Sequence, residues 1–85
     1  MQETREFRGI SQRLAVQYLE NLGGEAVDGG DRVEGDGWSV SLDERKVNPV
    51  GSITLNEVTV AFEGDAEVLE PLIGKFEQKA IRAGG

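Results

Sequence analysis

The sequence predicts an α+β fold in which an antiparallel sheet carries two helices on one face. Apolar residues recur with helical spacing near both ends of the chain, over residues 12–22 and 66–83. Between them, segments such as 38–42 alternate apolar and polar residues, which is typical of strands with one buried face. Placing both helices on the same side of an antiparallel sheet buries all of these apolar stripes. The expected order is strand, helix, four strands, helix, in one small domain over residues 1–85.

The first helix has clear start and stop signals. Residues 1–9 alternate poorly, so this segment is predicted to be either a charged edge strand or a frayed arm. Ser11 is a suitable N-cap, and the helix is expected from about Gln12 to Leu22. It should end at Gly23-Gly24, because glycine adopts the left-handed conformation of a helix C-terminus at low cost.

The middle of the chain is predicted to form four strands. Residues 25–33 fit a short hairpin around the Gly29-Gly30 turn. Residues 38–42 form a strand, and the charged residues 43–49 are expected to connect it to the next one. In that next region Ile53 and Leu55 are out of phase with the alternating residues of 58–62. A turn or bulge near Asn56-Glu57 is therefore predicted to reset the register.

The last helix is predicted in two parts. Asp65 is a suitable N-cap, but Pro71 lacks a backbone donor, so a loose first turn over 66–70 should precede a main helix from Pro71 to about Arg82. Its apolar stripe comprises Leu69, Leu72, Ile73, Phe76, Ala80 and Ala83.

The composition argues against catalysis and against nucleic acid. The chain contains no histidine and no cysteine, which removes the usual general bases, thiolate nucleophiles and zinc ligands, so we expect no enzyme activity. A formal net charge of -7 opposes binding to phosphate backbones or anionic lipid. Acidic residues with few lysines suggest a halophilic source. Without an apolar leader or spanning segment, a cytoplasmic location is expected.

Two groups of residues could suggest a bound ion, but both are better explained structurally. Four acidic residues around the first hairpin do not have the spacing of a calcium loop, and they fit a solvated turn: Asp28, Asp31, Glu34 and Asp36. Gly29-Gly30 matches no phosphate-binding motif, and its acidic neighbours would repel phosphate. We therefore predict no metal site, no cofactor and no catalytic residue. Trp38 and Tyr18 are expected in the core.

The last helix carries three basic residues on one face. Lys75, Lys79 and Arg82 are spaced i, i+4 and i+7, which is conspicuous in so acidic a chain. They could complement the helix dipole at its C-terminal turns. Alternatively, they could form a docking patch for an acidic protein partner or an anion.

The sequence closes on Gly84-Gly85, which admits two interpretations. A tail without side chains can enter a narrow active site and present its carboxylate, as in ubiquitin-like sulfur carriers and modifiers. The same pair also serves as a helix stop, and Gly23-Gly24 is predicted to do so at the end of the first helix.

Several segments together resemble a known family. They are Arg8-Gly9-Ile10, Tyr18 to Gly24, Gly37-Trp38, Val50-Gly51-Ser52-Ile53, Val58 to Asp65 and Arg82-Ala83-Gly84-Gly85. In these the chain is similar to the C-terminal domain of proteins related to the molybdopterin-synthase small subunit (MoaD-related proteins). The resemblance implies a TBP-like order of strand, helix, four strands and helix. It also implies a place beside sulfur-carrier modules, without assigning catalytic residues.

From these observations we expect a non-catalytic accessory or protein-interaction domain linked to molybdenum-cofactor or sulfur-carrier proteins. The alternative is a covalent sulfur carrier or ubiquitin-like modifier that acts through Gly85. The identity of the protein partner and self-association into a homo-oligomer are both left open.

Overall fold

The computed structural model describes the backbone of residues 1–84 and the side chains of residues 1–82. Its elements follow the predicted order of strand, helix, four strands and helix, and the α+β class is confirmed. They are β1 (Gln2–Arg8), α1 (Gln12–Asn21), β2 (Glu25–Val27), the 3-10 turn η1 (Asp28–Gly30), β3 (Arg32–Gly35), β4 (Trp38–Val50), β5 (Ile53–Gly64) and α2 (Ala66–Gly84). The likeness to a TBP fold stays a prediction.

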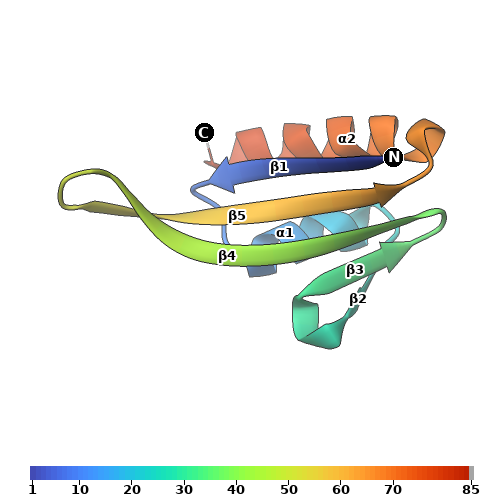
Figure 1. The fold of residues 1–85 in the computed structure, drawn as a ribbon, viewed down its shortest axis with the longest axis horizontal. Helices are drawn as coiled ribbons and strands as arrows, with labels where there is room; N and C mark the ends of the chain where they lie inside the picture. Colours follow the sequence, from blue (N-terminus) through green and yellow to red (C-terminus); the bar gives the residue numbers. More distant parts are fainter. Residues whose placement is uncertain (85) are drawn as a thin grey trace.

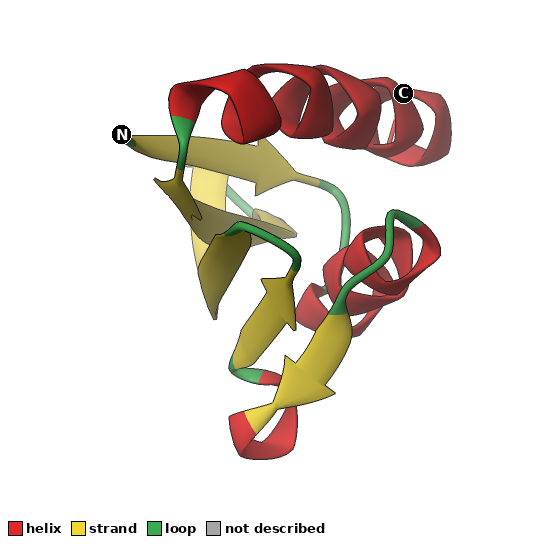
Figure 2. Cartoon of the chain, turned by 90° about the vertical axis from the view of Figure 1, so that its right-hand side faces the viewer, coloured by secondary structure: helices red, strands yellow, loops and turns green. Residues whose placement is uncertain are grey.

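The five strands form one antiparallel sheet in the order β1-β5-β4-β3-β2. β1 is therefore an edge strand, paired along its whole length with β5. Figure 2 shows α1 and α2 on the same side of the curved sheet, as predicted. We call the other side of the sheet the open face. Figure 1 shows the long β4–β5 hairpin extending well beyond the rest of the molecule, whose greatest extent is 41 Å.

The core lies between the sheet and the two helices. β5 contributes the fully buried side chains of Val58, Val60 and Phe62, which alternate with residues on the open face. The Phe76 ring of α2 makes edge-to-face contacts with Phe62 and Phe7, whose ring centroids lie 5.7 and 5.1 Å away. The apolar stripe predicted for α2 is buried at Leu69, Leu72, Ile73, Phe76 and Ala80, and the side chain of Ala83 lies outside the described residues.

The two ends of α1 are formed by the residues that the sequence predicts. The Ser11 hydroxyl accepts a hydrogen bond from a first-turn amide at 3.1 Å. At the other end, the amides of Gly23 and Gly24 donate to the carbonyls of Glu20 and Leu19, and Gly23 has φ 101°. This is a Schellman arrangement, which satisfies carbonyls that the helix leaves free.

The predicted connection over residues 43–49 is wrong, because these residues continue β4. They pair with β5 as far as Val47 opposite Leu55, and Val50 lies opposite Ile53. Beyond β1 and β3 the hairpin is a two-stranded ribbon, and we call its residues 45–56 the arm. Charged side chains are compatible with strand here because both surfaces of the ribbon are open to water, which the sequence pattern alone does not reveal.

The predicted bulge near Asn56-Glu57 is also wrong. β5 pairs without a break through these residues, and the register shift lies on β4, between Val47 and Val50. Ile53 and Leu55 are out of phase with the core residues because they lie on the open face of the arm, where Ile53 is 52% exposed. Pro49 falls inside the irregular stretch of β4, where its missing amide costs least.

α2 is one helix from Ala66 to Gly84, which corrects the prediction of a loose turn followed by a helix from Pro71. The carbonyl of Asp65 accepts hydrogen bonds from the amides of Val68 and Leu69, so the first turn is formed. Pro71 removes the helical donor to the carbonyl of Glu67, and Glu67 is exposed, so water can replace that donor. Burial of Leu69 and its neighbours outweighs the lost hydrogen bond.

Trp38 packs against two glycines that have no room for a side chain. The indole is only 8% exposed, which confirms its place in the core. A Cβ atom on Gly35 would overlap the atoms of the indole ring, and one on Gly24 would overlap both Trp38 and Val33. Glycine is therefore required at both positions for the ring to lie flat against the backbone.

We expect Gly35→Ala to lower the free energy of unfolding by ~1–3 kcal/mol, because the indole must move out of its seat. Gly74→Ala is the matched control, since Gly74 lies in α2 and an added Cβ would meet no atom within 4 Å beyond the adjoining helix backbone and its chain neighbours. That change should raise the free energy of unfolding by ~0.5–1 kcal/mol through helix propensity. Denaturant unfolding followed by Trp38 fluorescence measures both. Equal effects of the two substitutions would contradict the packing argument.

Candidate functional site

The three basic residues predicted as a docking patch lie on the outer surface of α2. Lys75 and Arg82 are exposed and Lys79 is half-buried. Helical spacing places Val68 and Pro71 on the same face of α2, toward its N-terminal end. This face therefore has an apolar end and a basic end.

A shallow hollow of about 180 Å³ lies at the apolar end. Its walls come from the end of α1, the start of β4 and the first half of α2, and they comprise Leu22, Trp38, Val68, Pro71, Leu72 and Lys75. Lys75 is the one charged residue among them. An apolar side chain could enter this hollow while a neighbouring carboxylate meets the ammonium group of Lys75.

No ion pair joins Lys75, Lys79 or Arg82 to another residue in the described part of the chain. Of the five arginines that precede α2, all but Arg13 pair with glutamates of their own or neighbouring strands. The helix dipole accounts for Arg82, which lies in the last turn of α2, but not for Lys75, which lies in the middle of it. The basic face is thus available to an external acidic group.

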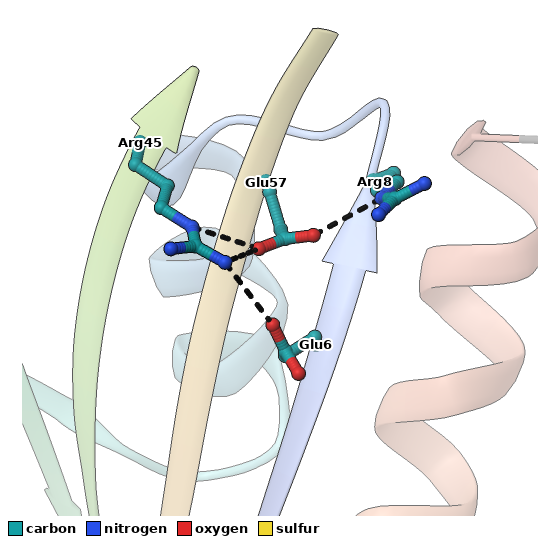
Figure 3. A network of polar contacts seen from close by, with 4 residues as sticks. All are labelled: Glu6, Arg8, Arg45 and Glu57. Atoms are coloured by element: carbon teal, nitrogen blue, oxygen red, sulfur yellow. Dashed lines mark hydrogen bonds and ion pairs between the residues drawn. The ribbon is translucent and has the colours of Figure 1, made fainter. Parts of the chain in front are cut away.

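The open face carries an ion-pair network that the sequence analysis missed (Figure 3). Glu57 on β5 lies directly opposite Arg8 on β1 and Arg45 on β4. Its Oε2 accepts a hydrogen bond from Arg8 Nε at 3.0 Å, and its Oε1 accepts from Arg45 Nη2 at 2.7 Å and from Arg45 Nε at 2.9 Å. Glu6 lies 3.7 Å from Arg45 Nη2. The two arginines cover Glu57, whose side chain is only 4% exposed.

The network fixes the charge of Glu57. The hydrogen bonds from Arg45 and then Arg8 lower the pKa of the Glu57 carboxyl, while desolvation opposes them. In return, the hydrogen bond to Glu57 raises the pKa of the Arg45 guanidinium. Each arginine is the direct cross-strand neighbour of the carboxylate, so the network joins β1, β5 and β4 where the arm leaves the sheet. A carboxylate held ionised in this way is suited to structure rather than to proton transfer.

The acidic residues around the first hairpin are spread over separate contacts. Asp31 Oδ1 accepts a hydrogen bond from Gln12 Nε2 at 2.9 Å, and Glu34 pairs with Arg32 at 3.3 Å. Within residues 1–84, no three carboxylates gather as potential metal ligands. Neither α1 nor α2 has a stretch apolar and long enough to cross a membrane.

The structure describes only the first of the two glycines at the end of the sequence. α2 extends to Gly84, two residues beyond the predicted end at about Arg82, so Gly84 is the last helical residue that the structure describes. Gly85 lies outside the described residues.

The lowered pKa of Glu57 predicts a pH dependence of stability. Its stabilising contribution should be fully present above the ordinary glutamate pKa of about 4.3 and be lost as pH falls through the lower pKa of the folded state. In Arg45→Met, the Glu57 pKa should rise, because the hydrogen bond that lowers it most is lost. NMR titration of the carboxyl carbons measures this. Arg32→Met, which breaks only an exposed pair, should leave the Glu57 pKa unchanged, and an unchanged pKa in Arg45→Met would contradict the assignment.

Comparison with known proteins agrees with the resemblance read from the sequence. A search of curated protein sequences found no match. The model of the family described as archaeal MoaD-like protein matches residues 3–85, which is nearly the whole chain. The match covers β1 from Glu3 onward, both helices and the Gly84-Gly85 pair. The chain therefore belongs to the family of archaeal MoaD-like proteins.

Proposed function

We propose that this chain is a non-catalytic protein-interaction domain of a sulfur-carrier-related system, and that it docks an acidic partner through α2. The observation that carries the proposal is the face of α2 that bears Lys75, Lys79 and Arg82, because Lys75 also lines an apolar hollow. These three residues lack ion-pair partners in residues 1–84, although the chain has a net charge of -7.

Charge and shape support the same kind of partner. A basic face on an acidic molecule attracts acidic surfaces locally, while the remaining surface repels them, so the complex should form in one orientation. The hollow, which Trp38 helps to line, supplies a site for an apolar side chain next to Lys75. Such a combination of an apolar anchor and a charged rim is typical of protein interfaces. The lack of histidine and cysteine supports a binding role rather than a catalytic one.

Reversing the charge of the α2 face should abolish binding of the partner. With the chain immobilised in high salt, the variant Lys75→Glu should lose a protein that the unmodified chain captures from its native cell. The control, Arg32→Glu, changes the net charge by the same amount at an exposed residue of β3, away from α2, and should keep that protein. Mass spectrometry identifies what is bound. Loss in both variants, or in neither, would contradict docking through α2.

Family membership favours a second candidate function, a covalent carrier that acts through Gly85. The family match extends to residue 85 and so includes the diglycine. In this role the carboxylate of Gly85, as a free C-terminus, would be adenylated by an activating enzyme and then converted to a thiocarboxylate or an amide. Because α2 continues through Gly84, the last helical turn would have to unwind before the tail could enter that enzyme.

Deleting Gly84 and Gly85 separates the two candidates. For an interaction domain, the deletion should leave partner binding and the unfolding midpoint nearly unchanged, since it shortens only the end of a helix. For a carrier, the full chain should support pyrophosphate exchange by an activating enzyme and the truncated chain should not. Intact-mass analysis of the native protein adds an independent readout. Replacement of one oxygen by sulfur at Gly85 would favour the carrier and contradict a purely non-covalent role.

A further inference from the structure

The outer edge of β4 is free along the arm. β3 pairs with β4 only from Trp38 to Ser41, and one further hydrogen bond joins the Leu42 amide to the carbonyl of Asp31 at 2.9 Å. From Asp43 onward, β4 pairs only with β5 among the residues that the structure describes. Exposed strand edges are templates for pairing with another strand.

The backbone direction shows which residues could form that pairing. Because the amide of Leu42 points to the outer edge, the alternation of an antiparallel strand points the backbone groups of Glu44 and Lys46 to the same edge. Pro49 lacks an amide and follows the irregular stretch of β4, so a ladder on this edge must end before it. The usable edge is therefore short and is centred on Arg45.

The charges on this edge are self-complementary. If two copies pair antiparallel about Arg45, Glu44 of one copy lies directly opposite Lys46 of the other, and the reverse pair forms by symmetry. The two Arg45 residues lie opposite each other at the two-fold axis of this dimer. Each already forms an ion pair with Glu57 of its own chain, with Arg45 Nη2 2.7 Å from Glu57 Oε1. Centring the pairing on Glu44 or Lys46 would instead place two like charges opposite each other.

We propose that two copies of this chain associate through their β4 edges, paired antiparallel about Arg45, so that their sheets become continuous. In this arrangement the Glu44 and Lys46 pairs exchange both backbone hydrogen bonds across the interface. The occupant of the free edge is thus a second copy of the chain, selected by the opposite charges of Glu44 and Lys46. This association does not depend on the binding function proposed for α2.

The tip of the arm provides apolar surface for the same interface. Val50 and Ile53 lie opposite each other at the tip and are 66% and 52% exposed. With Arg45 on the axis, Asn48 of one copy falls opposite Leu42 of the other, whose outer edge is already bonded to Asp31. The ladder is therefore confined to Glu44 to Lys46, and the tip must turn out of the sheet beside η1. There, beside the start of α1, is a hollow of about 370 Å³ lined by Gln12, Arg13, Val16, Gly29 and Gly30. Burying the tip in this hollow would add to what the short ladder contributes.

Salt should strengthen the association, because each copy carries a net charge of -7 and screening weakens their mutual repulsion. Sedimentation velocity of the full chain should therefore show a monomer at low salt and low concentration, and a dimer at molar salt and millimolar concentration. A chain that stays monomeric under the second condition would overturn the proposal.

Charge-reversed variants test the pairing itself. Lys46→Glu places glutamates opposite each other, and Glu44→Lys places lysines opposite each other, so each variant alone should be monomeric. Mixed in equal amounts, they should form a heterodimer, since both cross-strand pairs are then attractive. Lys75→Glu is the matched control on α2 and should dimerise like the unmodified chain. A mixture that stays monomeric, or single variants that still dimerise, would refute pairing about Arg45.

Two further measurements check that the Glu44→Lys variant is folded and that the outer edge of β4 is the surface buried in the dimer. Glu44 also accepts a hydrogen bond from the Gln12 amide at the start of α1, so the thermal unfolding of Glu44→Lys must confirm that it is folded at the assay temperature. In the unmodified chain, hydrogen exchange at the Glu44 and Lys46 amides should slow as concentration rises. Exchange at these amides that does not depend on concentration, in a sample that dimerises, would place the interface elsewhere and overturn the proposal.

Discussion

The pairing of β5 with both of its neighbours is the constraint on which the rest of the structure depends. Its register with β1 and β4 sends Val58, Val60 and Phe62 into the core and Glu57 to the open face. The same register brings Arg8 and Arg45 to opposite sides of Glu57, so the ion pairs follow from the strand pairing. A shift of one residue would expose the core residues and bury charges, which makes this register strongly specified.

Extending β4 and β5 beyond the other strands has consequences for association. Within the sheet, one side is covered by the two helices, whereas the arm has both surfaces open. Its apolar tip and its short charged edge are features that a monomer alone does not require. Pro49 has no amide to donate, so it limits the length of any ladder on this edge, and Lys46 favours a partner that places an acidic residue opposite it. Both residues therefore favour one specific pairing over general aggregation.

The basic side chains of this acidic chain fall into two groups. Some form ion pairs within the structure, and others have no ion-pair partner among the described residues. Arg5, Arg8, Arg32 and Arg45 pair with glutamates on or beside the sheet. The cations of α2 have no such partners in residues 1–84, and Lys75 lines an apolar hollow. Membership of the archaeal MoaD-like family is compatible with binding through this face and with a carrier role for Gly85. The two roles use different residues, so variants of Lys75 and deletion of the diglycine test them separately.

The sequence by itself determined the fold class, the order of elements and most of the core, because helical and strand periodicities report burial directly. Ser11 and Gly23-Gly24 marked the ends of α1, since capping is local chemistry. It also identified Lys75, Lys79 and Arg82 as one face of a helix. Only the tertiary structure decided the length of β4, the continuity of α2 through Pro71 and the burial of Glu57. All three features depend on partners that are distant in sequence. Pairing with β5 holds the charged residues of β4 in a strand, and packing against the core holds Pro71 in a helix. Arg8 and Arg45 meet at Glu57 only when β1, β5 and β4 are aligned.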